Sequence, residues 1–130
     1  MTRARRLVAR GFGLRAETLA AWRLRLAGYR ILARGYLARG YLARGGEIDI
    51  VAAKGDALVF VEVKARPSIE EALTAVTPQK RERLSRAARQ FLVEHPAFAS
   101  RTLRGDLVAV APGHWPRHCV AALPLDLGHL

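Results

Sequence analysis

The segment Ala57–Ala65 constrains the fold more than any other part of this chain. Its apolar side chains alternate between both faces of an extended strand, with Leu58 and Phe60 on one face and Val59 and Val61 on the other. A strand that is apolar on both faces must be covered on both sides, which is typical of the centre of a sheet packed between helices. We therefore expect a layered α/β (α+β) protein with this strand at its centre.

The rest of the chain predicts the elements around this strand. Thr77 is a suitable N-cap, Pro78 suits the first helical position, and an apolar stripe follows that ends before Pro96. Periodicity and turn residues elsewhere predict a helix, three strands, this second helix, a strand and a short edge strand. The expected ranges are 16–27, 29–33, 47–53, 57–65, 78–95, 106–111 and 119–123.

The composition indicates one globular domain. The chain has 130 residues, of which 51% are hydrophobic, and this is enough for a single core. We expect a domain at 13–125, a flexible basic N-terminus at 1–12 and a tail at 126–130. No apolar run approaches the length of a membrane span, so no membrane association is expected. The lone Cys119 allows no intramolecular disulfide, which favours a reducing compartment and a cytoplasmic location.

A five-residue duplication follows the first expected strand. Gly35–Arg39 reads Gly-Tyr-Leu-Ala-Arg, and Gly40–Arg44 repeats it. Because strand side chains alternate, an odd insertion inside a paired strand would reverse its faces. We therefore expect the segment 35–44 to form a protruding loop or a bulge, or to mediate exchange between chains.

Positive charge is concentrated in the first third of the chain. The formal net charge is +11, and residues 1–46 carry eleven arginines against a single acid, Glu17. A basic surface attracts polyanions, and nucleic acid is the commonest such partner in a cell. The alternative is an arginine-favouring composition with a solvated surface, because arginines outnumber lysines by 19 to 3.

Charged residues interrupt the central strand near its end. Glu62 and Lys64 are two apart, so their side chains leave the same face. Asp49 lies on the preceding strand of the same hairpin and is expected nearly opposite Glu62. Two carboxylates on neighbouring strands can hold Mg²⁺ or Mn²⁺ while leaving positions for water and a substrate phosphate. This chemistry suits phosphodiester hydrolysis, with Lys64 orienting the water or stabilising the transition state. A simple ion pair of Lys64 with either acid is the alternative.

Three segments carry a resemblance to a known family. Gly46–Ala52 reads GEIDIVA, Leu58–Arg66 reads LVFVEVKAR, and Thr77–Lys80 reads TPQK. Together, from Gly13 to about Val110, they resemble the YraN-type bacterial proteins of the restriction-endonuclease-like PD-(D/E)xK superfamily, and are similar in pattern to Holliday-junction resolvases. The resemblance implies a central mixed β-sheet flanked by helices, in the order given above. The duplication at 35–44 departs from the family pattern.

The same resemblance implies roles for individual residues. It makes Asp49 and Glu62 metal ligands, Lys64 the catalytic lysine, and Glu17 on the first helix a further ligand. Glu47 and Lys80 match family positions with less defined roles, and Lys80 would lie in the first turn of its helix, where free N–H groups favour phosphate. A solvated lysine is the alternative there. The resemblance also leaves open a homodimer.

Other chemistry-bearing residues form no recognisable site. His114, His118 and Cys119 lack the four ligands of a structural zinc site. Trp22 lies within a helical stripe and is expected in the core, as is Phe91, whereas the tyrosines of the duplication, Tyr36 and Tyr41, could stack on bases.

Three functions are therefore weighed from the sequence. The first is a metal-dependent endonuclease acting on DNA, including branched DNA. The second is a nucleic-acid-binding module that keeps the nuclease fold without cleavage. The third is a protein-interaction factor that uses the basic surface to bind an acidic partner, and no sequence feature supports it. The acids Glu17, Asp49 and Glu62 favour the enzyme, because acids repel phosphate unless a cation intervenes.

Overall fold

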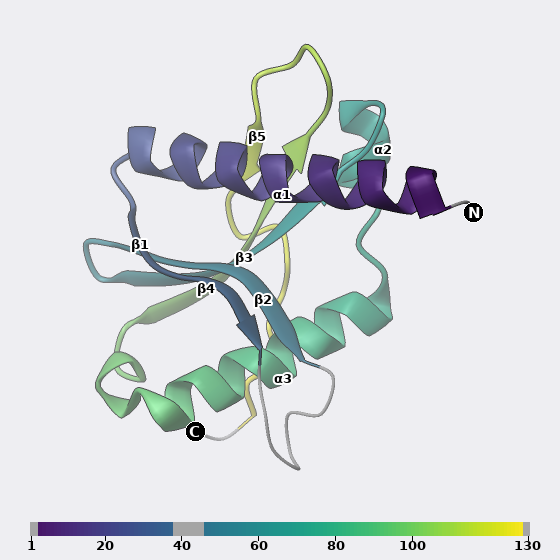
Figure 1. Cartoon of the computed structure of the whole chain (residues 1–130). Coiled ribbons are helices and arrows are strands. Elements are labelled where there is room, and N and C mark those ends of the chain that lie inside the picture. Colours follow the sequence, from purple (N-terminus) through teal and green to yellow (C-terminus); the bar gives the residue numbers. More distant parts are fainter. Residues whose placement is uncertain (1–2, 38–45, 129–130) are drawn as a thin grey trace.

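The computed structural model describes residues 3–37 and 46–128, with side chains from residue 15 onward (Figure 1). Its elements follow the predicted order with two short helices added. In chain order they are α1 (Arg3–Leu26), β1 (Arg30–Leu37), β2 (Glu47–Lys54), β3 (Ala57–Ala65), α2 (Ile69–Leu73), α3 (Pro78–Glu94), the 3₁₀ helix η2 (Pro96–Phe98), β4 (Thr102–Val110) and β5 (Arg117–Cys119).

The five strands form one mixed sheet in the order β1-β2-β3-β4-β5. Neighbours are antiparallel except for β3 and β4, which run parallel from Ala57 opposite Thr102 to Ala65 opposite Val110. The chain crosses from β3 to β4 through α2 and α3, as a parallel pair requires. The β2–β3 hairpin closes at Gly55, whose positive φ of 57° suits a tight turn.

Two helices cover the two faces of the sheet. In Figure 1, α1 lies across one face and α3 across the other. Residues on the α3 side of β3, Leu58 and Phe60, join one buried cluster, whereas Val59 and Val61 join a second cluster with α1. This confirms the mixed sheet flanked by helices and the doubly covered central strand, with the bounds expected from the sequence.

Helix α3 also follows its prediction. The Thr77 hydroxyl accepts a hydrogen bond of 3.2 Å from the Lys80 N–H, and Pro78 occupies the first turn. The predicted stripe is buried against the sheet: Leu84, Ala87, Ala88, Phe91 and Leu92.

The C-terminal segment after β5 closes the α3-side core. Leu123 is buried there, and Leu125 and Leu127 pack against the same cluster. The Leu123 N–H donates to the Gly105 carbonyl at 3.1 Å, and a Cβ at position 105 would lie 2.4 Å from the Leu123 oxygen. Only glycine therefore lets this segment lie so close to β4.

Helix α1 differs from the expectation at both its start and its buried face. It begins at Arg3, so residues 3–12, expected to be a flexible terminus, are helical. No proline interrupts this stretch. The buried positions are Ala16, Ala20, Ala21 and Leu24. Trp22 was wrongly expected in the core: it is 56% exposed, because two residues after the buried Ala20 it points to the other side of the helix.

The strands differ from the predictions at their ends. Strand β1 continues to Leu37, so Gly35–Leu37 of the duplication pair with β2 instead of forming a loop. The register of this pair shifts between Ile31 and Ala33, earlier than the predicted bulge. The predictions for 38–45, Tyr41 included, lie outside the described residues. Strand β5 covers Arg117–Cys119 instead of 119–123, because the chain turns at Ala121, where φ is +56°. Helix α2 was not predicted.

Candidate functional site

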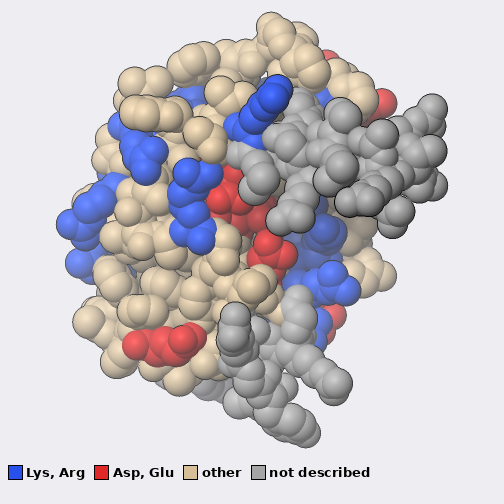
Figure 2. Space-filling view, viewed as in Figure 1, with Lys and Arg blue, Asp and Glu red and all other residues tan. Residues whose placement is uncertain are grey.

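A polar pocket lies where β2, β3 and the start of α3 meet. Its volume is about 170 Å³, and the lining residues are Glu47, Asp49, Glu62, Val63, Lys64, Lys80 and Arg83. Figure 2 shows acidic atoms in the middle of this face with Lys and Arg atoms on either side. Five of the six candidate residues from the sequence therefore line a single pocket.

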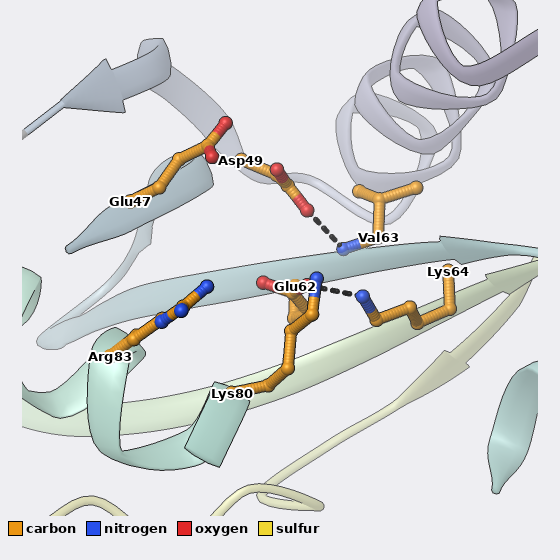
Figure 3. Close-up of a pocket in the computed structure, with 7 residues that line it drawn as sticks. All are labelled: Glu47, Asp49, Glu62, Val63, Lys64, Lys80 and Arg83. Atoms are coloured by element: carbon orange, nitrogen blue, oxygen red, sulfur yellow. Dashed lines mark hydrogen bonds and ion pairs between the residues drawn. The ribbon is translucent and has the colours of Figure 1, made fainter. Parts of the chain in front are cut away.

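Asp49 is placed by the end of the β2–β3 pairing. The paired register runs from Lys54 opposite Ala57 to Ile50 opposite Val61, and Asp49 follows directly. Its Oδ2 accepts a hydrogen bond of 2.8 Å from the Val63 N–H (Figure 3).

Strand β2 turns at this position. Ile48 joins the α3-side cluster, whereas Ile50, two residues later, joins the α1-side cluster. In a regular strand these two side chains would share one face. The turn brings the Asp49 carboxylate across to the backbone of β3.

Glu62 and Lys64 form an ion pair on the α3 side of β3. The Lys64 Nζ lies 2.9 Å from the Glu62 Oε1, and the two side chains are 7% and 13% exposed. They continue the face that carries Leu58 and Phe60. A buried ammonium needs a compensating charge, and Glu62 is the carboxylate paired with Lys64 in this position.

Helix α3 contributes the pocket's other two cations. Lys80 lies in its first turn and Arg83 one turn further along, so both side chains face β3 (Figure 3). Arg83 was not singled out from the sequence, although its spacing of three from Lys80 on a predicted helix could have identified it.

Burial and the crowding of like charges alter two pKa values. The pKa of Asp49 rises from its ordinary 3.8 to about 7, first because burial disfavours the carboxylate and then because Glu62, Glu47 and Glu17 repel it; the Val63 N–H opposes this. The pKa of Lys80 is lowered, chiefly by its contact with the Lys64 amine, while Glu62 and Asp49 act in the opposite direction. The pocket therefore holds neighbouring carboxylates and neighbouring amines at once.

Glu17 does not line this pocket. Its Oε1 pairs with the Arg34 Nε at 3.1 Å, so β1 holds this carboxylate. Its charge nevertheless contributes to the raised pKa of Asp49. The structure thus puts Glu17 within electrostatic range of the site but separates it from the residues that share the pocket.

The donor set suits a hard divalent cation. Asp49, Glu62 and Glu47 offer carboxylate oxygens, which Mg²⁺ and Mn²⁺ prefer. Within residues 3–37 and 46–128, no three acids, histidines or cysteines lie close enough together to form a complete metal cage. Mg²⁺ is commonly held by one or two carboxylates plus water and substrate phosphate, so the residues present fit such an ion.

A second polar cluster was missed by the sequence reasoning. Asp106 on β4 is fully buried and accepts hydrogen bonds from Arg104, at 2.8 and 2.9 Å, from His118 at 2.7 Å and from the Ala121 N–H at 2.9 Å. Arg104 in turn donates to the Tyr29 hydroxyl at 2.6 Å. Burial raises the pKa of Asp106, but these hydrogen bonds outweigh it and hold the pKa below its usual range. This cluster fixes β5 to β4 and accounts for His118.

None of the described helices combines the length and the apolarity needed to cross a bilayer.

Comparison with known proteins identifies the relatives of this chain. A protein 54% identical over 116 residues, from Methylocella silvestris, is matched across 89% of this chain and 90% of its own length, and is named a UPF0102 protein. A second UPF0102 protein, from Methylorubrum extorquens, is 49% identical, with 95% and 92% covered. Residues 16–110 match the profile of the uncharacterised protein family UPF0102. The chain therefore belongs to UPF0102, the YraN-type family, which lies in the endonuclease-like superfamily.

Proposed function

We propose that this protein is a Mg²⁺- or Mn²⁺-dependent endonuclease that hydrolyses phosphodiester bonds in DNA, with branched DNA as the first substrate to test. One observation carries the proposal: Asp49, Glu62 and Lys64 line a single pocket that Lys80 and Arg83 complete from α3. Membership of an endonuclease-like family supports the same reaction class.

The carboxylates account for the need for a cation. Three acids facing one pocket would repel a phosphate, and repulsion by the neighbouring carboxylates adds to the burial that raises the pKa of Asp49. Asp49 and Glu62 are the residues that would hold the ion, with Glu47 beside them. When bound, a divalent cation neutralises charge on phosphoryl oxygens and lowers the pKa of a coordinated water.

The basic residues would act on the phosphate itself. Lys64 has its ammonium fixed by Glu62 in a largely buried position, which suits a group that stabilises charge developing on a phosphoryl oxygen. Lys80 and Arg83 lie at the rim formed by α3 and would position the backbone of the nucleic acid. The net reaction adds water across a P–O bond to give a phosphate monoester and an alcohol.

The proposed compartment is the cytoplasm, where a chain with a lone cysteine and a DNA substrate would function. A homodimer would present two pockets to one branched substrate, and sedimentation equilibrium would measure the oligomeric state.

The test compares linear, flap and four-way-junction DNA, each with Mg²⁺, Mn²⁺ or chelator, for the wild type and for Lys64→Ala. We expect cleavage that depends on the metal and falls by about 10²- to 10³-fold in Lys64→Ala. Lys54→Ala is the matched control, because Lys54 is an exposed lysine at the opposite end of the same hairpin.

Two outcomes would contradict the proposal at different levels. If wild type and Lys64→Ala bind DNA alike and neither cuts any substrate, the protein is a binding module that keeps the nuclease fold. If binding barely weakens as salt increases, the nucleic-acid assignment itself is wrong, because phosphate contacts release counterions.

A further inference from the structure

A second groove lies apart from the proposed active site. It is formed by α1, α2 and the loop between β4 and β5, has a volume of about 500 Å³, and is within the size range of small-ligand sites. Its lining consists of Arg23, Ile69, Glu70, His114, Trp115, Pro116, Arg117 and His118. In Figure 1 the β4–β5 loop projects beyond α1.

Trp115 is the main apolar surface offered by this loop. Its side chain is 66% exposed, an unusual state for a tryptophan in a domain of this size. The Arg23 guanidinium lies 5.9 Å from the centre of the ring, and its Nε donates to the Pro116 carbonyl at 3.1 Å. Arg23 therefore ties the loop to α1 next to Trp115, while most of the indole surface stays accessible.

The charges around the ring favour an anionic ligand. Arg117 is exposed and lines the same groove as Arg23, and the chain carries a net charge of +11. Glu70 on α2 is the opposing charge and would weaken an anion's binding. An exposed indole beside two arginines is the combination that binds unpaired nucleotides, with the base stacked on the ring and the phosphate held by a cation.

The groove adjoins the end of the sheet that carries the proposed active site. Because β3 and β4 are parallel, the loop that leaves β4 after Val110 emerges at the same end as Glu62 and Lys64. The Arg66 N–H donates to the Val110 carbonyl at 3.0 Å, which ties the two exits together. The groove and the proposed active site thus both lie toward this end of the sheet.

We propose that the groove between α1, α2 and the β4–β5 loop binds an unpaired nucleotide of DNA, with Trp115 as the stacking surface and Arg117 as the phosphate contact. This inference rests on the proposed function for its nucleic-acid partner, and it adds a preference for substrates with single-stranded segments. Binding in chelator, where no metal-dependent cleavage occurs, tests it independently of catalysis.

The test uses the intrinsic fluorescence of the full chain. The sequence holds two tryptophans, so Trp22→Phe leaves Trp115 as the only indole. We expect oligothymidylate to quench this fluorescence in chelator. The affinities of the Trp115 variants are measured by the anisotropy of a labelled oligothymidylate, and Trp115→Ala should weaken binding roughly five- to hundredfold. Trp115→Phe should keep most of the affinity. Arg117→Gln should make the plot of log binding constant against log salt concentration less steep by about 0.7.

Trp22→Ala is the matched control. Trp22 is 56% exposed and has the Arg25 guanidinium 5.2 Å from its ring centre, yet it does not line the groove. Trp22→Ala should therefore leave the affinity unchanged. Equal losses of affinity in Trp115→Ala and Trp22→Ala would overturn the inference. Displacement of oligothymidylate by polyglutamate at matched charge would also overturn it, because the groove would then respond to charge alone.

The two proposals fail in distinguishable ways. If Lys64→Ala abolishes cleavage while Trp115→Ala binds oligothymidylate normally, the endonuclease stands and the stacking site does not. If no substrate is cut but Trp115→Ala loses its affinity for single strands, the stacking site stands on a non-catalytic protein.

Discussion

Replacing Asp49 with asparagine should stabilise the metal-free protein, and by an amount that depends on pH. The pKa of this carboxyl is about 7 in the folded chain, against 3.8 for the ordinary group. Each pKa unit corresponds to roughly 1.4 kcal/mol, so the ionised carboxylate destabilises the folded state by up to roughly 4 kcal/mol above neutral pH. The amide oxygen introduced by Asp49→Asn can still accept the Val63 N–H while removing the charge.

The direction with pH follows from proton binding. Between pH 3.8 and about 7 the folded wild type keeps a proton that the unfolded chain has released. Its stability therefore falls as pH rises through this window, and the loss is complete above it. The advantage of Asp49→Asn should be roughly 4 kcal/mol at about pH 8 and less than roughly 1 kcal/mol at about pH 4.

Urea denaturation in chelator, followed by circular dichroism at several pH values, measures this difference. Glu82→Gln is the matched control. It also removes one carboxylate charge, but from a side chain on α3 that is 69% exposed. A gain for Asp49→Asn that is independent of pH, or a loss of stability at about pH 8, would refute the account of Asp49. Saturating Mg²⁺ should narrow the gap, because an ion held by the folded wild type stabilises it by mass action.

Two further predictions concern neighbouring residues of β4, Gly105 and Asp106, which face opposite sides of the sheet. Gly105→Ala should destabilise the protein by about 1 to 3 kcal/mol in urea denaturation, because its Cβ would meet the Leu123 oxygen at 2.4 Å; an unchanged midpoint would contradict this packing. Asp106→Asn should destabilise by about 3 kcal/mol near neutral pH, because Arg104 and His118 lose their charged partner. Since the pKa of Asp106 is lowered in the folded state, its contribution is present above about pH 4 and lost on acidification, so wild type and Asp106→Asn should converge in acid if this is correct.

The centre of the fold could be predicted from the sequence because its constraints are local. Strand β3 has apolar residues on both faces, and α3 has its own cap at Thr77 and a regular stripe. Alternation along β3 also put Glu62 and Lys64 on one face, and counting from the turn at Gly55 put Asp49 beside them. The pocket that these residues share follows from that register together with the change of face in β2 at Asp49, which the alternation did not predict.

Features that depend on distant partners were not accessible from the pattern. The hydrogen bond from Arg104 to Tyr29 joins residues 75 positions apart, and Asp106 looked like one more residue of a buried strand. The ion pair of Glu17 with Arg34 likewise depends on how α1 crosses β1.

Other misses came from weak local patterns. Helix α2 has five residues, too few for periodicity to reveal. Trp22 was misplaced because alanines at 16, 20 and 21, with Leu24, make a narrower inner face than the apolar pattern suggested.

The packing of the last segment on Gly105 has a consequence for how the chain folds during synthesis. Residues 123–127 supply three leucines to the hydrophobic interior between α3 and the sheet, and they are made after every strand and helix that they cover. While the chain is still emerging from the ribosome, that interior is open to water along β4. The nascent chain therefore exposes apolar surface until Leu127 has left the ribosome, and it is during this interval that chaperones would find it most accessible.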